Sequence, residues 1–182
     1  FAQQTSVENI YAVGDCCEVF HRVSGQWTYL PLGDTANKQG RLAGRTIGGR
    51  PSPHPGVVGA QSFKIFELET AATGLNEAEA RKAGFDPVAD TYWGNAIAGS
   101  LGKRKLGLRL VADRTSGKLL GAQAIGEAGA VGRINTLSAA LWSGLTLEEI
   151  GWLDLAYAPP FGGAWDAIHP AAQRMQRKLR SM

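Results

Sequence analysis

The sequence has little of what builds a disulfide-stapled, metal-centred or membrane-spanning protein. Among its 182 residues there are only two cysteines, and these are neighbours, Cys16 and Cys17. Two adjacent cysteines provide neither a secreted disulfide framework nor a cysteine-rich zinc site. The sequence also lacks an uninterrupted apolar run near the roughly 20 residues that a transmembrane helix requires. We therefore expect no disulfide scaffold, no bound metal and no membrane span.

Net charge and catalytic motifs are also scarce. Nineteen basic and sixteen acidic residues leave a net charge of +3, which is too small to predict a nucleic-acid partner. The sequence contains no Gly-x-Ser-x-Gly, His-Glu-x-x-His, P-loop or Gly-x-Gly-x-x-Gly motif. Its histidines, His21, His54 and His169, are far apart, and we interpret them as surface or linker residues. The chain alone therefore shows no complete active site.

Glycine, in contrast, is abundant. The chain has 24 glycines among 182 residues, about 13%, where roughly 7% is usual. Because no Gly-X-Y period accompanies them, they indicate tight turns and close backbone approaches rather than a collagen helix. Gly40, Gly44 and Gly48 are four residues apart, so one face of the helix predicted over 35–47 carries almost no side chain. A sheet, another helix or a flat cofactor could approach that face closely.

The apolar run at residues 10–13 predicts a buried strand that ends at the turn Gly14-Asp15. Ligands of α/β folds bind at the carboxyl ends of strands. There the carboxylate of Asp15 could accept hydrogen bonds from two sugar-type hydroxyl groups, while Gly14 allows close approach. The alternative is that Asp15 is an ordinary turn carboxylate.

The segment after the next loop opens the glycine-rich helix. Asp34 is predicted to be its N-cap, and Gly48-Gly49 its end. The free N–H groups and the positive dipole end of such a helix stabilise negative charge on a bound group. The predicted cofactor-binding residues are therefore Gly14, Asp15, Pro31, Leu32, Gly33, Asp34 and Thr35.

Three prolines within residues 50–56 predict a linker over 50–57, which separates residues 1–49 from residues 58–182. Beyond the linker the pattern predicts an α+β domain with a mainly antiparallel sheet. Strands are expected at 62–68 and 88–93, with a hairpin formed by 106–111 and 118–125. Helices are expected at 76–82, 134–142, 146–153 and 170–180, the first and third opening with capping boxes.

Several of these segments resemble one family. Residues 5–16, Thr-Ser-Val-Glu-Asn-Ile-Tyr-Ala-Val-Gly-Asp-Cys, resemble the second flavin-binding fingerprint of the pyridine nucleotide-disulfide oxidoreductases. Pro31-Leu32-Gly33 and the helix after it resemble the next segment of the same proteins, and residues from about 56 onward resemble their C-terminal dimerisation domain. The segment Tyr157-Ala158-Pro159-Pro160-Phe161 is similar to the coenzyme A-disulfide reductase and NADH oxidase/peroxidase branch.

The resemblance implies that the chain is the C-terminal part of an FAD-dependent NAD(P)H oxidoreductase, a cytoplasmic homodimer. Residues 1–49 would be a remnant of an α/β FAD-binding domain, and the redox-active cysteine and the NAD(P)H-binding domain would precede Phe1. Asp15 would bind the ribityl chain of FAD, and the helix start from Leu32 to Thr35 would face the flavin pyrimidine. Tyr157 would act catalytically in the active site of the partner subunit. The chain alone would be inactive.

The electron acceptor is open. Coenzyme A-disulfide reductases usually carry Tyr-Tyr-Pro-Gly where this sequence has Gly99-Ser100-Leu101-Gly102, so a second phenol is missing. The acceptor could be coenzyme A disulfide, another disulfide, a persulfide or polysulfide, peroxide or oxygen. A different class also stays open, namely a separately encoded assembly module without flavin.

Overall fold

The structure is a computed structural model of the chain, and it describes residues 2–181. The chain divides into two compact units, Phe1–Val57 and Val58–Met182. Each unit has its own packing, and each is described by itself below.

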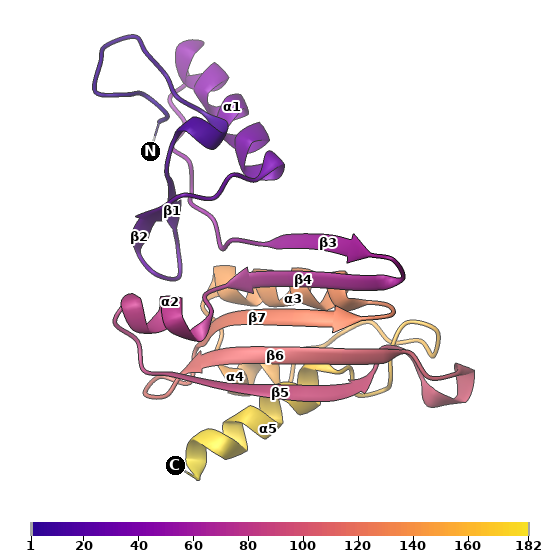
Figure 1. The fold of residues 1–182 in the computed structure, drawn as a ribbon. Helices are drawn as coiled ribbons and strands as arrows, with labels where there is room; N and C mark the ends of the chain where they lie inside the picture. The colour runs from indigo at the N-terminus through magenta and orange to yellow at the C-terminus, as the bar shows by residue number, and fades with distance from the viewer. Residues whose placement is uncertain (1, 182) are drawn as a thin grey trace. The chain divides into compact units, whose positions relative to one another are not determined.

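The first unit contains one long helix and little else of regular structure (Figure 1). Its elements are the 3-10 helix η1 (Gly14–Cys16), the strands β1 (Val19–His21) and β2 (Gln26–Thr28), and the helix α1 (Gly33–Ile47). Strands β1 and β2 form a two-stranded antiparallel sheet. α1 buries side chains four residues apart, which is one helical face, namely Thr35, Gln39 and Ala43.

The prediction of a buried strand at residues 10–13 is wrong. Tyr11 makes only an isolated antiparallel bridge with Gln4. The side chains of Ile10 and Val13 are 52% and 37% exposed. Residues 3–5 pair with this segment only around that single bridge, and no layer covers Ile10 and Val13, so the segment does not become a buried strand.

α1 also begins differently from the prediction. Leu32 is its N-cap, with extended backbone angles, and Asp34 already lies in the first turn. The Asp34 carboxylate pairs with Lys38 one turn later, 2.9 Å away, so it does not cap the helix. The predicted end is confirmed, because the helix stops at Ile47 and Gly48 is its C-cap.

The second unit is an α+β domain around an antiparallel five-stranded sheet, as predicted. Its strands are β3 (Gln61–Ile65), β4 (Leu68–Gly74), β5 (Pro87–Asn95), β6 (Lys105–Asp113) and β7 (Leu119–Gly126), in the order β3-β4-β7-β6-β5. Its helices are α2 (Glu77–Lys82), η2 (Gly99–Leu101), α3 (Ala130–Ser143), α4 (Leu147–Ile150) and α5 (Ile168–Arg180). α3 packs on β4 and β7, and α5 packs on β5 and β6, so both cover the same face, behind the sheet in Figure 1.

The core of this unit lies between the sheet and these two helices. Leu106, Leu108 and Leu110 of β6 are at most 1% exposed. They share the interior with Leu137 of α3 and Met175 of α5, both fully buried. The burial of each such side chain stabilises the fold by about 1.5–3 kcal/mol. The alternating leucines and both predicted capping boxes, at the starts of α2 and α4, are therefore confirmed.

The predicted strand at residues 62–68 is instead a tight hairpin. β3 ends at Ile65, which pairs with Leu68 at the start of β4. Phe66 and Glu67 form the turn between them, and Phe66 has a φ of 49°. The turn escaped prediction because glycine, asparagine or aspartate usually occupies such a left-handed position.

Asp113 ties the end of β6 to the two loops beside it. Its carboxylate accepts hydrogen bonds from the hydroxyl and N–H of Ser116, at 2.6 and 2.9 Å, and from the N–H of Asp86 at 3.3 Å. Burial alone would raise the pKa of Asp113, but these hydrogen bonds and one from the N–H of Thr115 outweigh it and hold the pKa below its usual value.

We therefore expect part of the stability of this domain to depend on pH through Asp113. Because the folded-state pKa lies below the unfolded one, the contribution is present above about pH 4 and is lost as pH falls through the folded-state pKa. Asp113→Asn should lower the free energy of unfolding by about 1 kcal/mol at pH 7 and flatten its decline in acid. Denaturant titrations at several pH values measure this. The control is Asp154→Asn, because the side chain of Asp154 is exposed. If the free energy of unfolding depends on pH in the same way in the wild type and in Asp113→Asn, Asp113 is not the group responsible.

Candidate functional site

In the first unit, η1 holds the predicted ligand carboxylate at the surface. Asp15 is exposed, in the first turn of η1. The N–H of Gly14 donates a hydrogen bond to Oε1 of Gln39, 2.8 Å away. Gln39 lies on α1 and is only 1% exposed. The helix therefore fixes the backbone that presents the carboxylate.

η1 and the start of α1 are also in direct contact. Gly14 has a φ of 76°, and a Cβ placed on it would lie 3.4 Å from the Cβ of Ala36. The helix starts with the N–H of Ala36 donating to the carbonyl of Leu32 at 2.9 Å. The N–H groups of the first turn have no carbonyl acceptor within the helix, so they can donate hydrogen bonds to a ligand.

The structure thus brings the predicted cofactor residues into one unit. Pro31, Gly33 and Asp34 are exposed at the start of α1, while Leu32 is half-buried. Thr35 is only 4% exposed, so it packs inside the unit and does not present its side chain to a ligand.

The bare face of α1 is open. Apart from the neighbouring residues and backbone of α1 itself, no described atom lies within 4 Å of a Cβ placed on Gly40 or Gly44. Within residues 2–181, then, no other element makes the close approach to the helix that these glycines were predicted to allow. A flat group or another element can reach the helix backbone there.

The two adjacent thiols both hydrogen-bond to the nearby backbone. Cys16 donates a hydrogen bond to the carbonyl of Val13, and Cys17 to the carbonyl of Gly14, both at 3.3 Å. Burial, and then the neighbouring Cys16, raise the pKa of Cys17 more than its contact with Gln39 lowers it. At neutral pH Cys17 is therefore protonated, and the thiolate that redox chemistry requires is disfavoured.

All three histidines are buried, so none is a surface residue, although His54 does lie in the segment predicted as a linker. His21, His54 and His169 are 4%, 5% and 7% exposed. Nδ1 of His54 accepts a hydrogen bond from the N–H of Gly56 at 3.1 Å, and burial lowers the pKa of this imidazole. Nε2 of His169 lies 2.8 Å from the carbonyl of Leu153. Among residues 2–181 no cluster of three or more histidine, cysteine or acidic residues could hold a metal ion.

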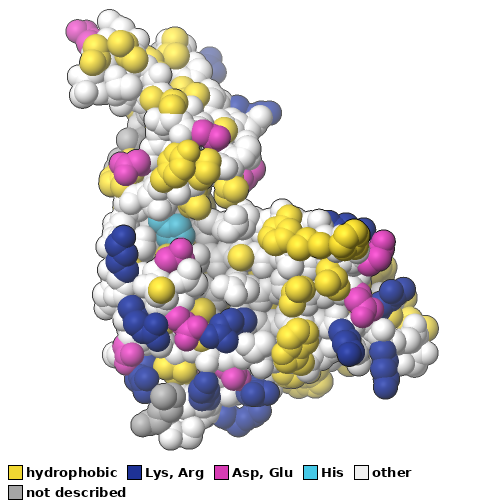
Figure 2. All heavy atoms as spheres, viewed as in Figure 1, with side chains coloured by type: hydrophobic (Ala, Val, Ile, Leu, Met, Phe, Trp, Pro, Cys, Tyr) yellow, Lys and Arg dark blue, Asp and Glu magenta, His cyan; other side chains and the backbone are white. Residues whose placement is uncertain are grey.

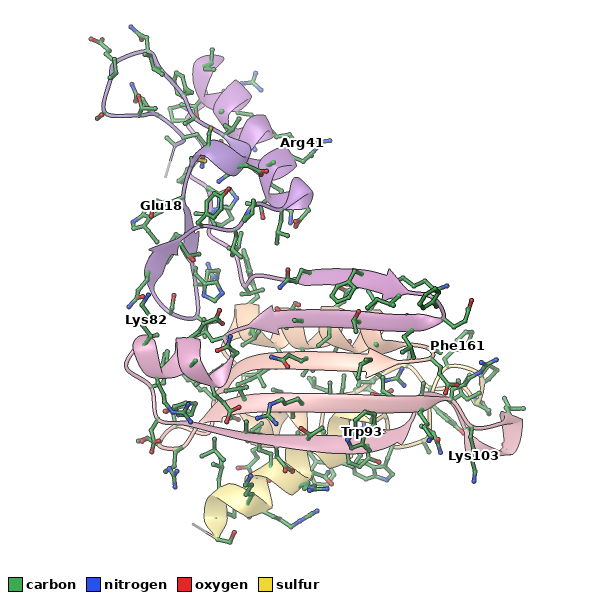
Figure 3. The ribbon with its side chains drawn as sticks, in the orientation of Figure 1. Glu18, Arg41, Lys82, Trp93, Lys103 and Phe161 are labelled. Carbon is green, nitrogen blue, oxygen red and sulfur yellow. The ribbon has the colours of Figure 1, made fainter. Side chains whose placement is uncertain are left out.

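In the second unit, Tyr157 lies on an irregular segment between α4 and α5. Its side chain is 55% exposed, and those of Phe161 and Trp165 are 76% and 56% exposed. The carbonyl of Pro159 accepts a hydrogen bond from the N–H of Ala98 at 3.0 Å. The Tyr157 segment therefore lies against the loop around η2, the second place where the sequence pointed to substrate contact. Phe161 and Lys103 are labelled near this end of the sheet in Figure 3.

A buried arginine that the sequence reasoning missed joins the same segments. Arg133 of α3 is 7% exposed, and its Nη2 lies 2.7 Å from Oδ2 of Asp166. It also donates to the carbonyl oxygens of Gly129, Ala96 and Phe161, at 3.1, 3.0 and 3.3 Å. The sequence gives one sign that Arg133 is buried: it directly precedes Ile134, with which the apolar face of the predicted helix begins.

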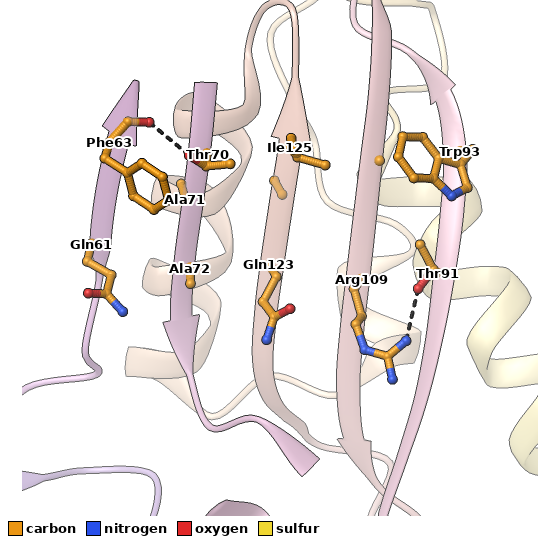
Figure 4. A pocket seen from close by; sticks show the side chains of 12 residues that line it. Gln61, Phe63, Thr70, Ala71, Ala72, Thr91, Trp93, Arg109, Gln123 and Ile125 are labelled. Carbon is orange, nitrogen blue, oxygen red and sulfur yellow. Dashed lines mark hydrogen bonds between the residues drawn. The ribbon is translucent and has the colours of Figure 1, made fainter. Parts of the chain in front are cut away.

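The face of the sheet opposite the helices carries a shallow hollow of about 380 Å³. Its rims are aromatic, because Phe63 of β3 and Trp93 of β5 are 59% and 64% exposed (Figure 4). Its floor lies over the inner strands, where Ala72 and Gly107 have little or no side chain, and Gln123 and Arg109 also line it. Figure 2 shows hydrophobic side chains gathered on this face. An exposed apolar patch of this kind is typical of an interaction surface.

Within residues 2–181, every helix is too short or too polar to cross a lipid bilayer.

The sequence and the fold both match known proteins. The dimerisation domain of the pyridine nucleotide-disulphide oxidoreductases matches residues 60–168. The NAD(P)H sulfur oxidoreductase (CoA-dependent) of Pyrococcus furiosus is 40% identical over 166 residues, which are 91% of this chain and 37% of that protein. An NADH oxidase of Methanocaldococcus jannaschii is 32% identical over 177 residues, 97% of this chain and 39% of that protein.

The solved structure of an NAD-dependent persulfide reductase from A. fulgidus is similar to this one with a TM-score of 0.94. The two are 36% identical, and the match covers 99% of this chain and 34% of that chain. The chain thus spans little more than a third of the length of these relatives. The domain match, in contrast, covers more than half of the chain itself. The chain belongs to the pyridine nucleotide-disulfide oxidoreductase family, whose dimerisation domain it contains.

Proposed function

We propose that the chain contributes part of the FAD site and the dimerisation domain to an FAD-dependent NAD(P)H oxidoreductase. The family implies a flavin and a nicotinamide cofactor. The observation that carries the proposal is the hydrogen bond from Gly14 to Gln39, which holds an exposed carboxylate beside the open start of α1. When bound, FAD would pass electrons from the nicotinamide to the acceptor.

The residues of the first unit fit this cofactor. The carboxylate of Asp15 can accept hydrogen bonds from vicinal hydroxyls of the ribityl chain. The N–H groups at the start of α1, at Gly33 and Asp34, and the positive end of its dipole suit the electron-rich pyrimidine edge of a reduced flavin. The open glycine face of α1 leaves room for a flat ring. A flavin-free assembly module would leave these features without a ligand.

For the acceptor, we propose a sulfur compound of the disulfide, persulfide or polysulfide class. Relatives named for sulfur and persulfide chemistry are 40% and 36% identical to this chain, and an NADH oxidase is 32% identical. Oxygen or peroxide is the second candidate. Because residues 99–102 carry no tyrosine, coenzyme A disulfide itself is the weaker choice within the sulfur class.

We further propose that the protein is a cytoplasmic homodimer in which Tyr157 acts in trans. The free thiols of Cys16 and Cys17 suit a reducing compartment. The phenol of Tyr157, on an exposed segment, can donate a hydrogen bond to a thiolate or oxyanion that develops on the acceptor. Such a bond is stronger in the transition state than in the ground state, so it accelerates the reaction.

Replacement of Asp15 by alanine should weaken FAD binding in the complete reductase. Buried ribityl hydroxyls would lose their acceptor at a cost of roughly 1–3 kcal/mol, so the affinity should fall about tenfold or more. Fluorescence titration of the apoprotein with FAD measures this, and the exposed Glu8→Ala is the control. Unchanged FAD affinity in a folded Asp15→Ala protein would count against the site and favour the flavin-free assembly module.

The 182-residue chain should associate as a two-fold dimer. Its apolar sheet face and its aromatic segment around Phe161 are exposed in the single chain, and their burial would supply the driving force. Light scattering at micromolar concentration should give about twice 19.3 kDa. A monomer at that concentration would contradict an interface contained in this chain.

Tyr157→Phe should slow acceptor reduction by roughly tenfold to a hundredfold in the complete reductase, because it removes only the hydrogen-bond donor. FAD content, flavin reduction by NAD(P)H and dimer mass should not change. Stopped-flow measurement of the two half-reactions separates these effects. Tyr92→Phe, a half-buried phenol on β5, is the matched control. If Tyr157→Phe reduces the acceptor at the wild-type rate, Tyr157 serves only in packing.

A further inference from the structure

We propose that Arg133 is the positioning residue for Tyr157. Its buried guanidinium holds the irregular segment 154–166 against the loop around η2, and so determines where the phenol of Tyr157 lies. This inference rests on the proposed function of Tyr157 in acceptor reduction, and adds a second residue to it, one that does not touch the acceptor.

The part of this segment near Tyr157 has few contacts of its own that could fix it, although Trp165 at its end packs against Trp152 and His169. It contains no regular secondary structure between Asp154 and Asp166. Within it, the N–H groups of Phe161 and Gly162 both donate to the carbonyl of Ala158, at 2.9 and 3.2 Å. Pro159 and Pro160 have no N–H to donate. Its large side chains are mostly exposed, so burial of apolar surface contributes little to holding it in the single chain.

Arg133 supplies the missing anchor by joining separate parts of the chain. It donates to the carbonyl of Ala96, directly after β5, and to the carbonyl of Phe161, four residues after Tyr157. Its partner Asp166 also accepts a hydrogen bond from the N–H of Ile168 at 3.0 Å, at the start of α5. One guanidinium therefore fixes the segment at two points after Tyr157, Phe161 and Asp166, and joins both to the end of β5.

The surrounding backbone is shaped to admit this guanidinium. Gly129 has a φ of 70°, and a Cβ placed there would collide with Nη1 of Arg133. A Cβ on Gly162 would lie 3.3 Å from Oδ2 of Asp166 and 3.6 Å from Nη2 of Arg133. Two glycines thus leave the space that the charged pair occupies. Lysine cannot replace the arginine here, because a single ammonium cannot reach carbonyl groups on several sides at once.

The geometry favours positioning over simple stabilisation. A buried ion pair is weak grounds for stability, since the loss of hydration offsets most of the attraction. The N–H groups of one guanidinium, however, point in fixed directions. When they bond to carbonyl groups of different segments, those segments can adopt only one arrangement relative to each other. The carbonyl of Pro159, hydrogen-bonded to the N–H of Ala98, extends this arrangement to within two residues of Tyr157.

The first test uses hydrogen exchange in the 182-residue chain. Arg133→Lys keeps the charge opposite Asp166 but removes the fork. The amides of Ala98, Phe161 and Gly162 should then exchange about tenfold faster, as expected for the loss of one hydrogen bond. Amides in the centre of β6 should not change. Arg109→Lys is the matched control, because Arg109 is also paired, with Glu77 and Thr91, but on the sheet. Unchanged exchange at the three amides would overturn the proposal.

The second test uses the complete reductase. Arg133→Lys should leave flavin reduction by NAD(P)H unchanged and slow acceptor reduction about tenfold. In combination with Tyr157→Phe the two effects should not add, because both remove one contribution of the same phenol. Additive effects would overturn the proposal.

The outcomes separate this inference from the proposed function. If Tyr157→Phe alone has the wild-type rate, the catalytic role of Tyr157 fails, and the exchange experiment alone decides whether Arg133 positions the segment. If Arg133→Lys does not fold, Asp166→Asn replaces it in both tests, since it weakens the same anchor from the other side. The predictions for the amides and for the half-reactions then remain the same.

Discussion

The burial of the β6 leucines against α3 and α5 is the interaction on which the second unit depends. β6 pairs with β5 on one side and β7 on the other, and Leu106, Leu108 and Leu110 fill the space beneath the helices. This packing places α3 across the sheet. From that position Arg133 reaches both the end of β5 and the segment before α5. The apolar core thus places the polar anchor, and the anchor places the exposed tyrosine.

The two units use the same physical device although their folds differ. In each, one buried polar side chain on a helix bonds to the backbone of an irregular segment that carries a proposed functional group. Gln39 of α1 holds Gly14 beside Asp15, and Arg133 of α3 holds Phe161 beside Tyr157. Neither segment is fixed by a disulfide or, within the described residues, by a metal cluster. A buried polar side chain has lost its hydrogen bonds to water. When it makes them to the backbone of a loop instead, it holds that loop in one defined conformation.

The sequence predicted what depends on neighbours along the chain. The alternating leucines of β6 and the capping boxes that begin α2 and α4 are local patterns, and the structure confirms them. The failures depend on contacts between distant residues. Residues 10–13 look like a strand but have no layer to cover them. His169 is buried, and the carbonyl of Leu153, sixteen residues away, lies 2.8 Å from its Nε2. Gln39 and Arg133 escaped notice because a polar residue on a helix usually faces water.

The anchor formed by Arg133 contacts main-chain oxygens at Ala96 and Phe161 rather than their side chains. Every residue type carries such an oxygen, so evolution can exchange the side chains of these two loops while the loops keep their places. Residues 99–102, in the loop after Ala96, can then vary in the side chains that they would present to the proposed acceptor. A single scaffold of this kind can diversify its substrate preference through the loop sequences, and the constraint falls on Arg133, Asp166 and the two glycines that make room for them.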